Sequence, residues 1–118
     1  MTESKIQQQI VEYFNNTYCL KNHNPRGLIF SIPNGGTRNK LEAITLKATG
    51  LLAGVSDLIV ILPNKKLIFV EIKTDIGKMS DKQIDFKKRV EALGFEYLLI
   101  KSLYEFKLCL QSQSTTQK

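Results

Sequence analysis

The sequence is poor in the side chains on which several common kinds of site depend. It holds one histidine, His23, and two cysteines, Cys19 and Cys109, which form no CxxC pair. This argues against histidine-based triads, zinc sites and disulfide scaffolds, which need several such residues at set spacings. A chain without disulfides fits a reducing compartment, so the expected location is the cytoplasm. None of the three residues has a chemical role that the sequence supports, and packing or loop positions are expected for them.

Long apolar runs are missing as well. No stretch approaches the roughly 20 residues of a membrane-spanning helix, and the N-terminal residues lack the apolar centre of a signal peptide. The 118 residues are 42% hydrophobic and 24% charged, as is normal for a globular domain. The length predicts one domain over residues 1–110. Residues 111–118 have no apolar anchor and are expected to form a frayed, disordered tail.

Acidic residues are the scarcer of the two charge types. Seventeen Lys and Arg residues stand against eleven Asp and Glu residues, which leaves a net charge of +6. A positive excess on a small domain favours a polyanionic partner such as nucleic acid, although many small basic proteins bind none.

The spacing of apolar residues predicts alternating helices and strands. Helices are expected near residues 3–14, 41–49, 80–93 and 102–110, and strands near 28–32, 58–62, 67–70 and 95–100. Asn34-Gly35-Gly36 is expected to form a turn, and Pro63-Asn64-Lys65-Lys66 to join an antiparallel hairpin. The order helix, strand, helix, strand, strand, helix, strand, helix indicates a mixed α/β fold, with a central sheet flanked by helices.

Two carboxylates and a lysine stand at the ends of the two hairpin strands. Asp57 precedes the first strand, and Glu71 and Lys73 follow the second on one shared face. Antiparallel pairing would bring all three to one edge of the sheet. Two carboxylates without histidine suit a hard cation such as Mg²⁺, which could activate water and stabilise charge on a phosphoryl oxygen. The alternative is a solvated strand end, with Asp57 capping a turn.

The register of the hairpin decides whether Asp57 faces Glu71. If Leu62 pairs with Leu67 across a four-residue turn, paired residue numbers sum to 129 and Asp57 points to the wrong side. A sum of 128, or a bulge near Asp57, would place both carboxylates on one face. We predict one of these two arrangements, because a regular ladder summing to 129 would leave no site.

A third acid lies on the first helix. Glu3 shares a helix face with the apolar residues Ile6, Ile10 and Phe14, whereas Glu12 points away. Burying an unpaired carboxylate is costly. Either Glu3 lies at the frayed helix start and reaches solvent, where it suits the helix dipole, or it belongs to a site.

Several short motifs together resemble a known nuclease family. Asp57 followed, after thirteen residues, by Glu71-Ile72-Lys73 is similar to the PD-(D/E)xK nuclease signature. The surroundings resemble the virus-type replication-repair nuclease domain, VRR-NUC, in these segments: Glu3…Ile6-Gln7, Asn34-Gly35-Gly36, Gly54-Val55-Ser56-Asp57-Leu58, Glu71-Ile72-Lys73-Thr74, Gly77…Ser80…Gln83 and Ala92-Leu93-Gly94. The resemblance covers about residues 3–101 and implies a restriction-endonuclease-like core in a stand-alone phage or bacterial protein. Ser56 stands where the superfamily name has proline, a turn position that binds no metal.

The resemblance also implies a catalytic role for five residues. Asp57 and Glu71 would bind the catalytic Mg²⁺ or Mn²⁺, and Lys73 would position the attacking water and stabilise the pentacovalent phosphate. Gln83 would help to place the metal-bound water or Lys73. Glu3 would complete the site through water or a second metal, which gives its inward position a reason.

The activity that the resemblance implies is hydrolysis of DNA phosphodiester bonds, leaving 5′-phosphate and 3′-hydroxyl ends. Small stand-alone members resemble Holliday-junction resolvases, which are homodimers, so a homodimer acting on branched or duplex DNA is expected. Its contacts to DNA phosphates would come from basic residues near the site: Arg38, Lys40, Lys47, Lys78, Lys82, Lys87, Lys88 and Arg89. For each of these, the alternative is a solvated helix face interleaved with acids.

Two other functions remain compatible with the sequence. One is a catalytically silent DNA-binding or regulatory protein on the same fold, which would require a missing or misplaced acid. The other is a small assembly subunit that binds protein, which would have neither a metal site nor salt-dependent DNA binding.

Overall fold

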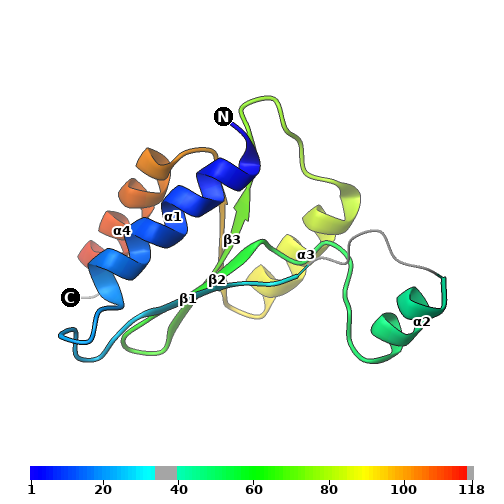
Figure 1. The fold of residues 1–118 in the computed structure, drawn as a ribbon, viewed down its shortest axis with the longest axis horizontal. Coiled ribbons are helices and arrows are strands. Elements are labelled where there is room, and N and C mark those ends of the chain that lie inside the picture. Colours follow the sequence, from blue (N-terminus) through cyan, green and yellow to red (C-terminus); the bar gives the residue numbers. More distant parts are fainter. Residues whose placement is uncertain (34–39, 117–118) are drawn as a thin grey trace.

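The computed structural model describes residues 1–33 and 40–116, so the predicted turn at residues 34–36 and Arg38 lie outside the described part. The observed order of elements is the predicted one (Figure 1). The elements are α1 (Glu3–Tyr18), β1 (Leu28–Ser31), α2 (Lys40–Ala48), β2 (Leu58–Leu62), β3 (Lys66–Ile72), α3 (Asp81–Ala92), β4 (Glu96–Ile100) and α4 (Leu103–Thr116). Helix α4 therefore extends into the segment expected to be a frayed tail.

The four strands form one sheet in the order β1-β2-β3-β4. Strands β1, β2 and β3 are antiparallel neighbours, whereas β4 runs parallel to β3. The chain returns to the parallel position through α3, because a parallel neighbour needs a crossover connection. Helices α1 and α4 pack together on one face of the sheet, which we call the core face, and α3 lies against β4 on the other.

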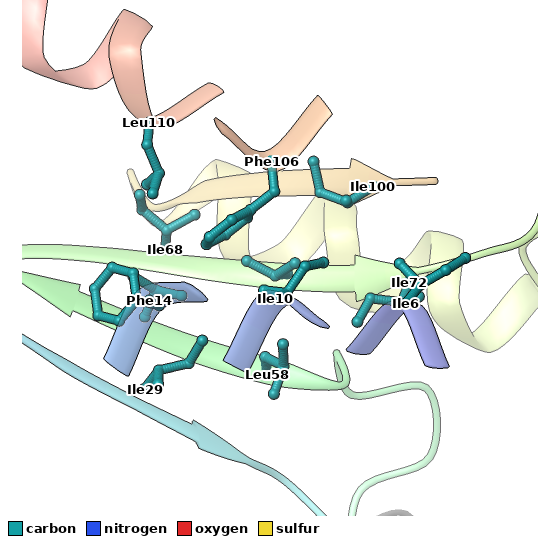
Figure 2. Packing of buried hydrophobic residues seen from close by; sticks show 12 residues of the cluster. Ile6, Ile10, Phe14, Ile29, Leu58, Ile68, Ile72, Ile100, Phe106 and Leu110 are labelled. Atoms are coloured by element: carbon teal, nitrogen blue, oxygen red, sulfur yellow. The ribbon is translucent and has the colours of Figure 1, made fainter. Parts of the chain in front are cut away.

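The main core lies between the sheet and the pair α1 and α4 (Figure 2). Ile6, Ile10 and Phe14 recur at four-residue spacing on α1 and are all buried, as the helical period requires. They meet side chains from the strands and α4, including Ile29, Leu58, Ile68, Ile72, Ile100, Phe106 and Leu110. Burying one such side chain stabilises the fold by about 1.5–3 kcal/mol. Cys19 and Cys109 are free thiols packed at the edge of this core.

The hairpin between β2 and β3 has the register that places both carboxylates on one face. Leu62 pairs with Lys66 and Leu58 with Val70, so paired numbers sum to 128. The turn therefore has three residues, and Asn64 and Lys65 both take positive φ angles, 67° and 63°. This arrangement is one of the two that the site requires, and it confirms that prediction.

Helix α2 differs from the other helices because it packs against no other helix or strand within residues 1–33 and 40–116. Figure 1 shows it set apart from the sheet and from the three other helices. It ends at Ala48, and Gly50, which has a φ of 114°, lets the chain turn away from the helix. Leu41 and Ile44 on its apolar face are 78% and 57% exposed.

Candidate active site

Glu71 is a buried charged group at the end of the central strand β3. Its neighbours Val70 and Ile72 point into the core, so alternation along the strand turns Glu71 to the opposite face. The Glu71 residue is only 1% exposed. A carboxylate removed from water to this degree needs polar partners or a cation to remain charged.

Asp57 is fixed next to Glu71 by the register and by hydrogen bonds. The backbone N–H of Ile72 donates to its Oδ2 over 2.8 Å, and its own carbonyl accepts from Ile32 N at the end of β1. The Asp57 side chain is thus hydrogen-bonded to β3, and the Asp57 backbone extends the antiparallel pairing with β1. Ser56, in the position where the superfamily name has proline, is buried, and its Oγ lies 3.2 Å from the carbonyl oxygen of Leu58.

Lys73 and Gln83 both contact the same oxygen of Glu71. The Nε2 of Gln83 donates to Glu71 Oε2 over 2.9 Å, and Lys73 Nζ lies 3.4 Å from that oxygen. Lys73 comes from the same face of the chain two residues after Glu71, and Gln83 comes from the first turn of α3. The sequence grouped these three residues, and the structure brings them into contact.

The other oxygen, Glu71 Oε1, is buried and has no hydrogen-bond partner among the residues that the structure describes. Burial is the main reason that the pKa of Glu71 rises from 4.5 to about 7, and the negative charge of Asp57 raises it further. The Lys73 ammonium opposes this rise, whereas Glu3 adds a smaller repulsion. The net effect of the groups around Glu71 therefore disfavours its negative charge, and a bound cation would relieve this.

The start of α3 holds Gln83 in a fixed direction. Ser80 Oγ accepts from Gln83 N over 3.2 Å, and Gln83 Oε1 accepts from Ser80 N over 2.9 Å, which is the predicted capping box. Because Oε1 is occupied by the cap, the Nε2 end of the same amide is turned to Glu71. One side chain thus links the helix start to the carboxylate.

Gly54 brings the segment before Asp57 directly onto the start of α3. Its φ is 84°, and a Cβ at this position would lie 2.8 Å from Gln83 N and closer still to the Lys82 carbonyl oxygen. Distances below 3 Å to backbone atoms force a displacement. Only glycine therefore allows the strand that carries Asp57 to sit this close to the helix that carries Gln83.

We expect Gly54→Ala to lower the free energy of unfolding by about 2–3 kcal/mol, because it adds a backbone collision to left-handed strain. Gly50→Ala is the matched control, since Gly50 also has a positive φ but has no atom within 4 Å of the added Cβ. It should cost only the strain, about 1–2 kcal/mol. Urea unfolding of both variants measures the difference. Equal losses would contradict the close approach.

Glu3 lies at the exposed start of α1 and is near enough to Glu71 to raise its pKa. It does not close a ligand set, because the side chains that the structure describes contain no group of three acids, histidines or cysteines arranged to hold a metal. The pair Asp57 and Glu71 nevertheless fits a hard divalent cation in chemistry. Both are oxygen donors, and one buried carboxylate oxygen lacks any partner.

Tyr97 is a residue near the site that the sequence analysis did not single out. It is 6% exposed, packs with Val55, Phe86 and Val90, and its hydroxyl is buried without a partner. Burial raises its pKa strongly, and the charges of Glu71 and Asp57 raise it further. The alternation of β4 could have placed this side chain on the face of Glu71, since Tyr97 pairs with Phe69 two residues before it.

The basic residues proposed to contact DNA differ in their exposure. Lys47, Lys78, Lys82 and Lys88 are exposed. Lys87 is half-buried and forms an ion pair with Glu91 at 3.1 Å, and Arg89 lies 3.7 Å from Asp85. For Lys40 the described part of the chain includes the backbone but not the side chain. Part of α3 thus has lysine and arginine interleaved with acids, as in a solvated helix face. The four exposed lysines are accessible to a partner.

Comparisons with known proteins agree on one family. The sequence matches the VRR-NUC domain family over residues 1–102. A solved structure described as a VRR_NUC domain protein matches with a TM-score of 0.73 at 18% identity, covering 95% of this chain and 87% of the other. A second, described as a VRR_NUC domain, matches with a TM-score of 0.63 at 21% identity, covering 92% and 94%.

No curated protein matches the sequence significantly, and no helix in the described residues is both long and apolar enough to cross a membrane. VRR-NUC domains are nuclease domains with a restriction-endonuclease-like fold, act on DNA and use divalent metals in general. The shared fold, the matched 102-residue segment and the grouping of Asp57, Glu71 and Lys73 lead to one assignment. The chain belongs to the VRR-NUC family of nuclease domains.

Proposed function

We propose that the protein is a metal-dependent DNA endonuclease that hydrolyses phosphodiester bonds. The observation that carries the proposal is the state of Glu71. One of its oxygens is held by Lys73 and Gln83, and the other is buried, unpartnered and repelled by Asp57. A buried carboxylate oxygen without a partner is costly, and a bound divalent cation would offset that cost.

Each residue of the site has a distinct task in this proposal. Asp57 and Glu71 hold the divalent cation, Mg²⁺ or Mn²⁺, which when bound lowers the pKa of water and neutralises phosphate charge. Lys73 orients the attacking water or stabilises the negative charge that develops on the phosphate oxygens. Gln83 fixes the direction of the Glu71 carboxylate and the position of Lys73. Glu3 completes the site through water or a second cation.

The DNA would be held through its phosphates. The exposed lysines near the site, Lys47, Lys78, Lys82 and Lys88, are suited to phosphate contacts that carry little sequence information. Structured duplex DNA, such as a Holliday junction, is the proposed substrate, in a role in DNA repair or replication of a phage or bacterium. A cytoplasmic location in a bacterial or phage-infected cell remains a prediction.

A homodimer is proposed because two apolar surfaces have no partner among the residues that the structure describes. One is the face of α2 with Leu41 and Ile44. The other, which we call the open sheet face, is formed by Leu28 and Phe30 on β1 and their pairing partners Ile61 and Ile59 on β2. Ile29 and Val60 between them turn to the core face, so the open sheet face is opposite α1. No described helix covers it, since α3 packs against β4.

In the proposed dimer, each of these two surfaces covers the other one in a second copy. If α2 of each protomer packs on the open sheet face of its partner, two equivalent contacts form at once, as two-fold symmetry requires. A stable interface needs roughly 1,200–2,000 Å² of total buried surface, and this reciprocal arrangement doubles the area of a single helix–sheet contact.

A catalytically silent DNA-binding or regulatory protein is the second candidate. It is supported by the absence of a three-ligand metal group among the described side chains. A silent protein would bind DNA with a salt dependence that reflects its lysines, but it would not cleave.

Cleavage of matched four-way-junction, flap and linear duplex DNA, with Mg²⁺, Mn²⁺ or EDTA, tests the proposal. We expect metal-dependent cleavage that Lys73→Met lowers by about 10²–10⁴-fold, because the substitution removes the ammonium but keeps an unbranched stem. Lys107→Met is the matched control; Lys107 lies on α4, over the ring of Tyr13. Paired cuts in the junction support the resolvase-like dimer. No cleavage by folded protein with either metal would favour the silent DNA-binding protein.

A further inference from the structure

The segment that follows Lys73 carries an apolar side chain that has no evident structural use. Ile76 is 91% exposed, more than any other large hydrophobic residue among those the structure describes. Its neighbours in the chain are polar or small, so it is the one large apolar side chain in its own turn. Exposing an isoleucine to this degree forgoes the stabilisation that burial would give.

The position of Ile76 is fixed relative to the active site. Thr74 and Gly77 close a turn through the Gly77 N–H and the Thr74 carbonyl at 3.1 Å, and Ile76 is one of the two residues at its tip. A Cβ on Gly77 would lie 3.4 Å from Lys73 Cδ, so the turn folds back onto the stem of the lysine. The turn therefore lies against the Lys73 side chain.

A hollow lies beside this turn. It has a volume of about 460 Å³ and is lined by Met1, Ile6 and Gln9 of the N-terminal segment, by Thr74, Asp75 and Ile76, and by Lys101 and Ser102, which precede α4. Figure 1 shows the segment between β3 and α3 rising next to the start of α1. None of the proposed catalytic residues lines the hollow, but Thr74, which directly follows Lys73, does. The hollow is far larger than the roughly 30 Å³ of one water molecule.

We infer that Ile76 is a wedge that packs against an opened base step of the DNA, next to the phosphate that the site cleaves. Apolar side chains that stand at the tip of a rigid element can enter between bases and replace their stacking. A displaced base would be received by the hollow beside the turn. The proposed ligand is thus DNA with a weakened base step, as at a nick, flap or junction, and an intact duplex opens less readily. This inference rests on the proposed function and explains how the same site would prefer branched DNA.

Fluorescence of 2-aminopurine tests the wedge without any cleavage. The base is placed next to the discontinuity of a nicked and a flapped duplex, and the Lys73→Met protein is added at saturation with Mg²⁺. We expect fluorescence to rise on binding, because unstacking relieves quenching. The additional substitution Ile76→Ser should remove most of this rise, whereas Ile76→Leu should keep it. Leu93→Ser is the matched control, since Leu93 is 75% exposed at the far end of α3.

Cleavage by the otherwise unchanged protein gives a second readout. Ile76→Ser should lower the ratio of flap or junction cleavage to linear duplex cleavage by about tenfold, which corresponds to the loss of one large apolar contact. An equal fluorescence rise with Ile76→Ser, or an unchanged cleavage ratio, would overturn the wedge and leave the nuclease intact. A fluorescence rise that depends on Ile76, without any cleavage by the unsubstituted protein, would support the wedge and reject the nuclease. If Ile76→Ser instead changes the molecular mass in solution, Ile76 belongs to an interface between copies and the wedge is wrong.

Discussion

Glu71→Gln should make the metal-free protein more stable at neutral and alkaline pH while it abolishes cleavage. The substitution keeps the shape of the side chain and removes a charge that burial and Asp57 both disfavour. Gln83 Nε2 can still donate to the oxygen of the new amide. The same change removes a cation ligand, so the loss of activity and the gain of stability have one origin.

The pH dependence of stability follows from the pKa of Glu71. In the folded, metal-free protein this pKa is about 7, against 4.5 when the group is exposed. Between these values the folded state keeps a proton that the unfolded state has released. The contribution of Glu71 to the free energy of unfolding should therefore be highest below about pH 4.5. It should fall as the pH rises to about 7. The total loss should be of the order of 3 kcal/mol.

Urea unfolding in EDTA across this range measures the effect. Glu71→Gln should remove the decline that Glu71 causes and exceed the unsubstituted protein in stability at about pH 8 by up to about 3 kcal/mol. Glu12→Gln is the matched control, because Glu12 is an exposed acid that accepts only a weak hydrogen bond from Gln8 at 3.4 Å. It should leave the pH profile unchanged. If Glu71→Gln is less stable than the unsubstituted protein at alkaline pH, the charge of Glu71 stabilises the fold and the prediction is wrong.

Adding Mg²⁺ should reverse the order of stability. Binding stabilises only the protein that holds the ion, and it requires the deprotonated carboxylate, so the gain should grow with pH. With saturating Mg²⁺ at about pH 8, the unsubstituted protein should recover the stability that it loses between about pH 4.5 and pH 7, and Glu71→Gln should respond little. An equal response of both proteins would place the cation elsewhere.

Much of the fold could be predicted because local signals agree with the tertiary structure. The four-residue recurrence of Ile6, Ile10 and Phe14 is a helix signal, and the same residues form the buried face. Ser80 and Gln83 predicted the start of α3, and the capping box is present. Such features depend only on residues close in sequence.

The register of the hairpin could not be predicted in the same way. It depends on a three-residue turn in which both Asn64 and Lys65 have positive φ. Asparagine tolerates this conformation, but lysine gives no signal for it. The sequence left two arrangements that preserve the site, and only the observed pairing of Leu62 with Lys66 selects between them.

The sequence predicted which residues form the candidate site, but not the electrostatic environment of those residues. Spacing and resemblance named Asp57, Glu71, Lys73 and Gln83, and the structure shows the contacts among the last three. That one Glu71 oxygen lacks a partner depends on packing from four elements, as does the burial of the Tyr97 hydroxyl. No pattern along a single strand contains this information. The Glu3 contribution was also left open, because its exposure depends on where the helix start lies relative to β3.

The isolated position of α2 has a consequence that tests the proposed dimer. Ile44→Asp and Leu41→Asp should convert the dimer to a monomer, because each places a charge in the apolar contact with the open sheet face of the partner. The protomer should keep its fold, since these side chains are exposed and α2 packs against no other described element. Sedimentation equilibrium measures the mass, and thermal unfolding measures the remaining stability of the protomer.

The reciprocal change identifies the surface onto which α2 packs. Phe30→Asp on the open sheet face should also yield monomers. Tyr104→Asp should not, because Tyr104 is an exposed aromatic residue on α4, away from both surfaces. If two facing sites cut a junction together, the monomeric variants should nick one strand and lose the paired cuts, while their cleavage of linear duplex persists. A monomeric unsubstituted protein would contradict the exchange of α2. A dimer that survives both Ile44→Asp and Phe30→Asp would assign the interface to another face, because a buried unpaired carboxylate costs several kcal/mol and no contact of this size can absorb two of them.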